Sequence, residues 1–224
     1  MNKKIILLGG TINSGKNMAH DLIKHELGAD NVHSEYFARE LKDTCKKAFS
    51  RYAIHLNQSV DDVLNILNEA DFDGYDKASE ILNNLLIKDH NWYEDKTDST
   101  RIILQSVGTD IVKNKIDQNH WVKCAAKAIL ESDKEYIVLT DFRYSDELYT
   151  LVKECRNLSI NYDTYTFYPI SIKRISDTKS TIASHASENG LVNFDDWYSH
   201  IDNNGTIEQT TEQIKVLLQE IQQD

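Results

Sequence analysis

The chain has 224 residues, of which 40% are hydrophobic and 27% are charged. These proportions are typical of a globular protein and exclude an intrinsically disordered, collagen-like or coiled-coil chain. At about 150 residues per domain, the length allows one domain, or one domain with an inserted lobe. Lys and Arg number 25 against 36 Asp and Glu, and the net charge of −11 argues against a nucleic-acid polymer as the main partner.

The sequence also predicts a cytoplasmic protein that does not enter a membrane. Its strongest apolar run, Ile5 to Leu8, is too short to cross a bilayer or to form the core of a signal peptide. The cysteines Cys45, Cys124 and Cys155 are odd in number, lie far apart and form no CxxC pair. We therefore expect reduced thiols rather than a zinc site or a disulfide framework.

The predicted elements alternate between strands and helices along the chain. We expect strands at about 3–8, 31–34, 136–139, 165–172 and 197–201. We expect helices at about 15–27, 37–48, 99–112, 120–131, 144–155 and 207–221. Buried strands that alternate with helices predict an α/β fold, in which a parallel sheet is covered on both faces.

Two further segments do not fit this alternation. Residues 57–90 are acidic, with apolar positions at helical spacing, and predict a helical insert at about 55–98 between two strands. Residues 173–190 are rich in Ser, Thr, Lys and Asp and poor in apolar residues, which predicts a mobile loop.

The first predicted strand ends in a glycine-rich loop. Gly10 to Lys16 read GTINSGK and match GxxxxGK, with a strand before the loop and a helix after it. Such a loop turns backbone N–H groups toward an anion, and Lys16 adds a positive charge for the β- and γ-phosphates of a nucleotide. The alternative is a plain glycine turn with an exposed lysine. Asn17 departs from the usual Ser or Thr, whose hydroxyl binds magnesium.

Two polar clusters later in the chain can bind a second substrate. Arg101 and Gln105 are four residues apart and share one face of a predicted helix, where they can bind a phosphate and a base edge, or simply face solvent. Asp141 and Arg143 follow a predicted strand, where they can bind magnesium and neutralise phosphate charge, or form a structural ion pair.

These features occur together with other stretches in a recognisable order: Arg101 to Asp110, Trp121 to Lys123, the Asp141-x-Arg143 pair, and His185 to Leu191. Combined with the glycine loop, they resemble the deoxynucleoside monophosphate kinases of tailed bacteriophages. The resemblance implies a P-loop kinase sandwich with a five-stranded parallel sheet, formed by one domain over 1–224 with its insert and a lid at about 173–190. It also implies transfer of the ATP γ-phosphoryl group to a deoxynucleoside monophosphate, with Mg²⁺, by a homodimer in the host cytoplasm.

The resemblance also implies roles for individual residues. Those matched to the ATP site are Gly10, Asn13, Ser14, Gly15, Lys16, Asn17, Met18, Asn203 and Gly205. Those matched to the acceptor site are Phe37, Lys42, Arg101, Gln105, Trp121 and Arg143. The residues implied to act in catalysis are Lys16, Asp141, Arg143 and the lid residue Arg174. The residues implied to bind Mg²⁺ are Asn17 and Asp141.

Several alternatives stay open at this point. Trp121 has apolar neighbours that suit core packing as well as base stacking. The chain as a whole can be a P-loop kinase of another small acceptor, such as a coenzyme precursor or a sugar acid. It can also be a nucleotide-binding module without turnover.

Overall fold

The computed structural model describes residues 2–52, 104, 106–158, 165–175 and 190–224. The chain forms two compact units, one made of Met1–Phe37 with Val122–Asp224 and the other of Ala38–Trp121. The first unit contains a β-sheet with helices packed on it, and the described part of the second is helical.

The sheet of the first unit has five parallel strands, which confirms the predicted fold class. They are β1 (Lys3–Gly9), β2 (Val32–Glu35), β3 (Tyr136–Phe142), β4 (Tyr165–Lys173) and β5 (Ser199–Asp202). Their order is β2-β3-β1-β4-β5, so β1 is the central strand, hydrogen-bonded to β3 and β4. Strands covered on both faces read as continuous apolar runs, which explains why β1 lacks an alternating pattern.

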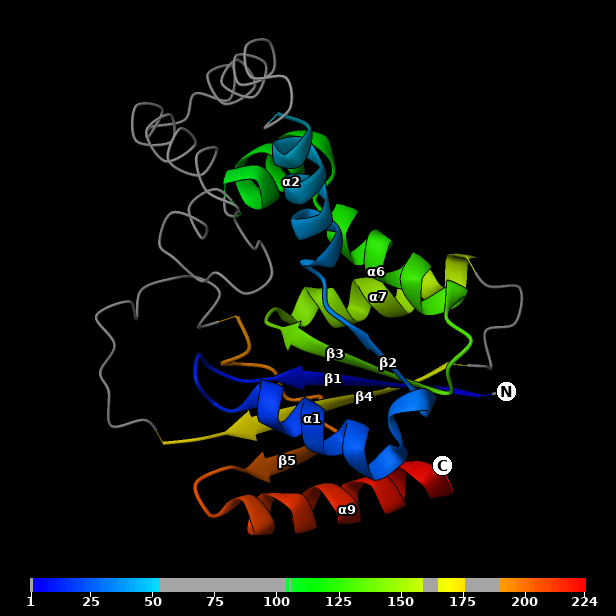
Figure 1. Ribbon diagram of the computed structural model, residues 1–224, viewed down its shortest axis with the longest axis vertical. Helices are drawn as coiled ribbons and strands as arrows, with labels where there is room; N and C mark the ends of the chain where they lie inside the picture. Colours follow the sequence, from blue (N-terminus) through cyan, green and yellow to red (C-terminus); the bar gives the residue numbers. More distant parts are fainter. Residues whose placement is uncertain (1, 53–103, 105, 159–164, 176–189) are drawn as a thin grey trace. The chain divides into compact units, whose positions relative to one another are not determined.

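Helices cover both faces of this sheet (Figure 1). They are α1 (Lys16–Leu27), α6 (His120–Glu131), α7 (Ser145–Leu158) and α9 (Ile207–Gln223), with a short 3₁₀ turn η1 at Ala29–Asn31. Ile6 and Leu8 pack with α1 and α9, whereas Ile5 and Leu7 pack with α6 and α7. Alternate residues of β1 therefore enter two separate cores, which makes the three-layer sandwich of the P-loop kinases.

The strand β3 differs from its prediction in a way that affects the site. It continues three residues past Leu139, and its pairing with β1 shifts register between Leu7 and Gly9, where Gly9 faces Phe142. Such an irregularity re-aims the side chains beside it. Asp141 is consequently part of the strand rather than of the loop that follows it.

The second unit contains α2 (Arg39–Tyr52) and η2 (Ser106–Ile116). The prediction of an ordinary α-helix ending at residue 112 is wrong for its described part, because η2 is a π-helix that runs on to Ile116. The Asp117 N–H donates to the Val112 carbonyl, five residues back, at 2.9 Å. Apolar spacing predicts a helix but not which hydrogen-bond ladder it uses. The predicted insert at 55–98 lies outside the described residues.

Two further predictions concern the whole chain. Cys45, Cys124 and Cys155 are all free thiols, as expected, and burial raises the pKa of Cys45 and of Cys155 to about 12. Among the described residues, no helix combines the length and the apolar character needed to cross a membrane.

Candidate functional site

A tight glycine loop joins the central strand β1 to α1. Its backbone is left-handed at Gly10 (φ 149°), Asn13 (φ 61°) and Gly15 (φ 98°), and the Ser14 N–H donates to the Thr11 carbonyl at 3.2 Å. A side chain at Gly10 would bring its Cβ to 2.5 Å from the Ile172 carbonyl oxygen of β4. Glycine is therefore required there both for the backbone angle and for the close approach to β4.

Lys16 closes this loop on itself. Its Nζ donates to the carbonyl oxygens of Gly10 at 2.8 Å and Thr11 at 2.7 Å. It is also the first residue of α1, where the helix N-terminus contributes a partial positive charge. The ammonium group and the helix end thus place positive charge at the same turn, as an anion site requires.

The loop is also attached to the turn that follows β5. Asn203 is 7% exposed, and its Nδ2 donates to the Ser14 carbonyl at 2.8 Å. Its Oδ1 accepts a hydrogen bond of 3.2 Å from the Thr210 hydroxyl of α9. Asn203, which the resemblance matched to the ATP site, is therefore buried with both ends of its amide engaged, whereas Gly205 is exposed.

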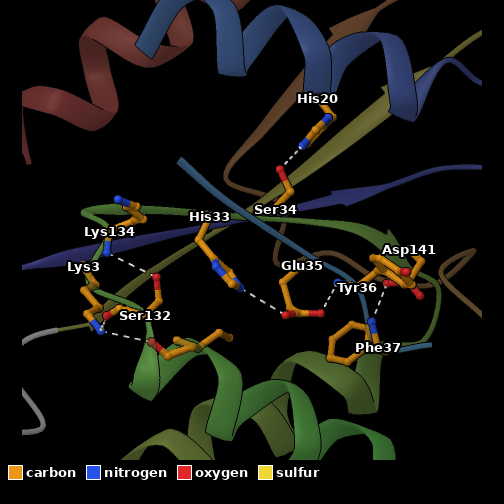
Figure 2. A network of polar contacts seen from close by, with 11 residues as sticks. Lys3, His20, His33, Ser34, Glu35, Tyr36, Phe37, Ser132, Lys134 and Asp141 are labelled. Atoms are coloured by element: carbon orange, nitrogen blue, oxygen red, sulfur yellow. Dashed lines mark hydrogen bonds and ion pairs between the residues drawn. The ribbon is translucent and has the colours of Figure 1, made fainter. Parts of the chain in front are cut away.

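Carboxylates hold the turn that follows β2. Figure 2 shows Glu35 beside the Tyr36 backbone and Asp141 facing that of Phe37. The Tyr36 N–H donates to Glu35 Oε1 at 2.9 Å, and the Phe37 N–H donates to Asp141 Oδ1 at 2.8 Å. Glu35 is 2% exposed, and its Oε2 lies 3.1 Å from His33 Nε2. Asp141 thus anchors the β2 turn to the neighbouring strand β3.

A third carboxylate fixes the backbone that carries Arg143. Glu147 is buried in the first turn of α7, and its Oε2 accepts hydrogen bonds from the Arg143 N–H at 2.8 Å and the Tyr144 N–H at 3.1 Å. The Arg143 side chain is exposed. Glu147 therefore holds the position from which the guanidinium group extends.

An open cleft of about 580 Å³ lies beside the glycine loop, at the carboxyl ends of β1, β4 and β5. Gly10 and Thr11 line it, together with the basic side chains of Arg143, Lys173 and Arg174. His200 also lines the cleft, and burial together with the charge of Lys173 lowers its pKa. The cleft therefore has three basic side chains next to the loop, at the strand ends where parallel α/β sheets bind ligands.

The structure brings together most of the residues matched to the ATP site. Gly10 and Thr11 of the loop line the cleft, while Asn17 is exposed and Met18 is half-buried in the first turn of α1. Of the predicted catalytic residues, Arg143 and Arg174 line the cleft, and Asp141 lies near the end of β3. Their roles in catalysis stay predictions.

The residues matched to the acceptor site are distributed differently. Phe37 is 5% exposed and packs in the core beneath α6 and α7. In the second unit, Lys42 lies on α2, and Trp121 is 6% exposed, with its indole N–H donating to the Gly108 carbonyl at 2.9 Å. These contacts agree with the core-packing alternative for Trp121. Arg101 and Gln105 lie outside the described residues, and the acceptor site stays a prediction.

Sequence reasoning missed Glu35 and Glu147. Glu147 could have been found from the sequence, because a glutamate in the first turn of a predicted helix is a common partner of the backbone N–H groups at the helix start. Glu35 gave no signal, because a single carboxylate in a short strand resembles any solvent-facing residue.

The strand order and the glycine loop after the central strand define the fold of the P-loop kinases. The model of the deoxynucleotide monophosphate kinase family matches residues 79–214, more than half of the chain. The chain belongs to that family, which confirms the resemblance found in the sequence.

A curated relative that carries the same family name matches a shorter stretch of the chain. The deoxynucleotide monophosphate kinase of Escherichia phage RB69 is 34% identical over 83 residues. The aligned segment covers 36% of this chain and 30% of the phage protein. The chain thus matches less than a third of the length of that relative.

Proposed function

We propose that this protein transfers the γ-phosphoryl group of ATP to a deoxynucleoside 5′-monophosphate. Membership of the family supports the class of reaction. The observation that carries the proposal is the glycine loop with Lys16 at the end of the central strand, beside a cleft lined by Arg143, Lys173 and Arg174.

The donor side of the reaction falls to the glycine loop. Its backbone N–H groups and Lys16 would bind the β- and γ-phosphates, and the start of α1 would add its partial positive charge. Arg143 and Arg174 would stabilise the charge that develops on the transferred group. Phosphoryl transfer in line needs positioning and cations rather than a protein nucleophile, so no such nucleophile is required here.

For the acceptor side, we propose the residues matched by the resemblance. Arg101 and Lys42 would bind the monophosphate, because cationic side chains form charge-assisted hydrogen bonds with phosphate oxygens. Gln105 would bind the base edge, since an amide both donates and accepts.

The side chains present suit a magnesium ion that arrives with ATP. Within the described ranges, no group of three or more His, Cys, Asp or Glu side chains forms a metal cage. Mg²⁺ in kinases needs only one or two protein oxygens because substrate phosphates and water supply the rest. Asn17, exposed at the start of α1, and Asp141 are the oxygen donors we propose, directly or through water. The ion would neutralise charge on the β- and γ-phosphates.

A coupled assay of ADP formation tests the proposal. Purified protein with Mg²⁺ and ATP is assayed against the deoxynucleoside monophosphates of the usual bases, and at least one is expected to stimulate ADP production strongly. A folded sample that no deoxynucleoside monophosphate stimulates would contradict the proposal. Stimulation by another small phosphate acceptor alone would indicate a different P-loop kinase, and ATP binding without turnover would indicate a binding module. Light scattering coupled to size exclusion tests the proposed homodimer.

A further inference from the structure

We propose that Asn203 is a positioning residue of the phosphate loop, which orients the Ser14–Gly15 peptide, rather than a contact to the adenine base. The inference rests on the proposed function, because it states how the ATP site is held in shape. Asn203 lies just after β5, far along the chain from the loop it contacts.

The Asn203 side chain has a single orientation that satisfies its neighbours. The Ser14 carbonyl oxygen can only accept, so the amide nitrogen must face it, at 2.8 Å. The amide oxygen then faces the hydroxyl of Thr210, a residue with no exposed surface, at 3.2 Å. The backbone N–H of Asn203 donates to the Lys173 carbonyl at 2.8 Å. The residue is thus fixed from α9 and from β4 while it bonds the loop.

This contact determines where the next N–H group of the loop points. In a trans peptide the C=O and the following N–H point in opposite directions, and the described chain has no cis peptide. Because the Ser14 carbonyl points toward Asn203, the Gly15 N–H points away from it. Within the described part of the chain, the Gly15 N–H has no hydrogen-bond partner. It is therefore held ready to donate to an anion.

Gly15 is required by the same contact. A Cβ at this position would overlap Nδ2 of Asn203, and the left-handed φ of 98° disfavours any other residue. Gly15, the glycine that precedes Lys16 in the loop, thus leaves the space that the Asn203 amide occupies. The arrangement is also incompatible with a direct base contact, since Asn203 is buried and both ends of its amide are already engaged.

The experiment compares two variants of the full-length protein by titration calorimetry with ATP and with inorganic tripolyphosphate. Asn203→Ala removes the bond to the loop. Gln213→Ala is the control, because Gln213 bonds the N–H and the carbonyl of Asp202 in the same turn, each at 2.9 Å, without touching the loop. We expect Asn203→Ala to weaken the binding of both ligands about tenfold, which is the effect of losing one hydrogen-bond donor to an anion. We expect Gln213→Ala to stay within about twofold for both.

The outcomes separate this inference from the proposed function. Wild-type protein that binds neither ligand contradicts the proposed function. If Asn203→Ala weakens the binding of ATP but leaves the binding of tripolyphosphate unchanged, Asn203 is a base contact and the inference is overturned. Wild-type protein that binds ATP but not tripolyphosphate would also overturn it. Equal effects of Asn203→Ala and Gln213→Ala would also overturn it.

A milder variant serves if Asn203→Ala does not fold. Thr210→Val removes the hydroxyl that orients the Asn203 amide and keeps the amide itself. We expect it to weaken both ligands about threefold, because the amide would be less well oriented toward Ser14. No change for either ligand would overturn the inference.

Discussion

The turns after β1 and after β2 and β3 are held in opposite ways, although they lie at the same edge of one sheet. In the glycine loop, donors from Lys16 and Asn203 bond backbone carbonyl oxygens. In the turns after β2 and β3, carboxylates bond backbone N–H groups instead, with Glu35, Asp141 and Glu147 as acceptors.

The difference determines how each side can recognise phosphate. Where side chains satisfy the carbonyl oxygens, a backbone N–H group such as that of Gly15 stays available to an anion. Where carboxylates occupy the N–H groups, the backbone has little left to donate, and an anion must be bound by side chains such as Arg143. We therefore expect substitutions in the glycine loop to affect ATP and substitutions on the other side to affect the acceptor.

The largest test of this comparison is Lys16→Ala. It removes both the charge and the bonds to the Gly10 and Thr11 carbonyl oxygens. We expect kcat/KM for ATP to fall about 100-fold or more, as for loss of a preorganised donor at developing charge. Lys24→Ala, which removes the same charge from the last turn of α1, is the control and should behave as wild type. A fall of less than about threefold in kcat/KM for Lys16→Ala would contradict the expectation that substitutions in the glycine loop affect ATP.

The next effect is expected at Arg101, which we propose to bind the acceptor. Arg101→Ala should raise the KM for the deoxynucleoside monophosphate about tenfold, because a charge-assisted hydrogen bond contributes roughly 1.5 to 3 kcal/mol. The KM for ATP should change little. Initial rates with each substrate varied in turn measure both constants, and an unchanged acceptor KM would remove Arg101 from the acceptor site.

Asp141 sharpens the comparison, because it combines a structural contact with a proposed role toward magnesium. Asp141→Ala leaves the partly buried Phe37 N–H without this acceptor, so the free energy of unfolding should fall by about 1 to 3 kcal/mol, measured in urea. Asp141→Asn keeps an acceptor oxygen and should be within about 1 kcal/mol of wild type, yet lower kcat because the charge is lost. Equal destabilisation by the two variants would contradict the Phe37 contact as the cause.

The smallest effect concerns His200 in the cleft. Its pKa is lowered by burial and by Lys173, so the unfolded chain takes up a proton at higher pH than the folded protein does. Stability should therefore decrease slightly as the pH falls through about 6.5, the ordinary histidine value. In His200→Gln the decrease in melting temperature between pH 7.5 and 5.5 should be smaller. His25→Gln, at an exposed site of α1, is the control and should show the same decrease as wild type. A decrease in His200→Gln as large as in wild type would refute the assignment to His200.

The sequence predicted the parallel sheet and its helices well, because the fold depends on long apolar runs and helical spacing. Ile5 to Leu8 and Ile137 to Leu139 are buried strands in any reading of the pattern. Boundaries were harder to predict. The strand β3 runs on through polar Asp141 because pairing with Gly9 continues there, and that pairing depends on a partner 133 residues away.

The site was predictable only where a local pattern carries the chemistry. The glycine loop was found because its residues are contiguous and their spacing follows from the backbone of the turn. The contacts of Asn203 with Ser14 and of Asp141 with Phe37 join residues separated by 189 and 104 positions, and no local pattern predicts them. A resemblance places such residues near a ligand but does not say which backbone group they hold.

The ring of Trp197 rests on the last residue of β1. A Cβ on Gly9 would lie 2.5 Å from Cη2 of this ring, which also lines the cleft beside Arg143. An indole so close to the opening should change its fluorescence when an anionic nucleotide enters. Of the other two tryptophans, Trp121 is buried in the second unit and Trp92 lies outside the described residues. We therefore expect Trp197 to serve as an intrinsic optical reporter for label-free titrations of ligands that enter the cleft.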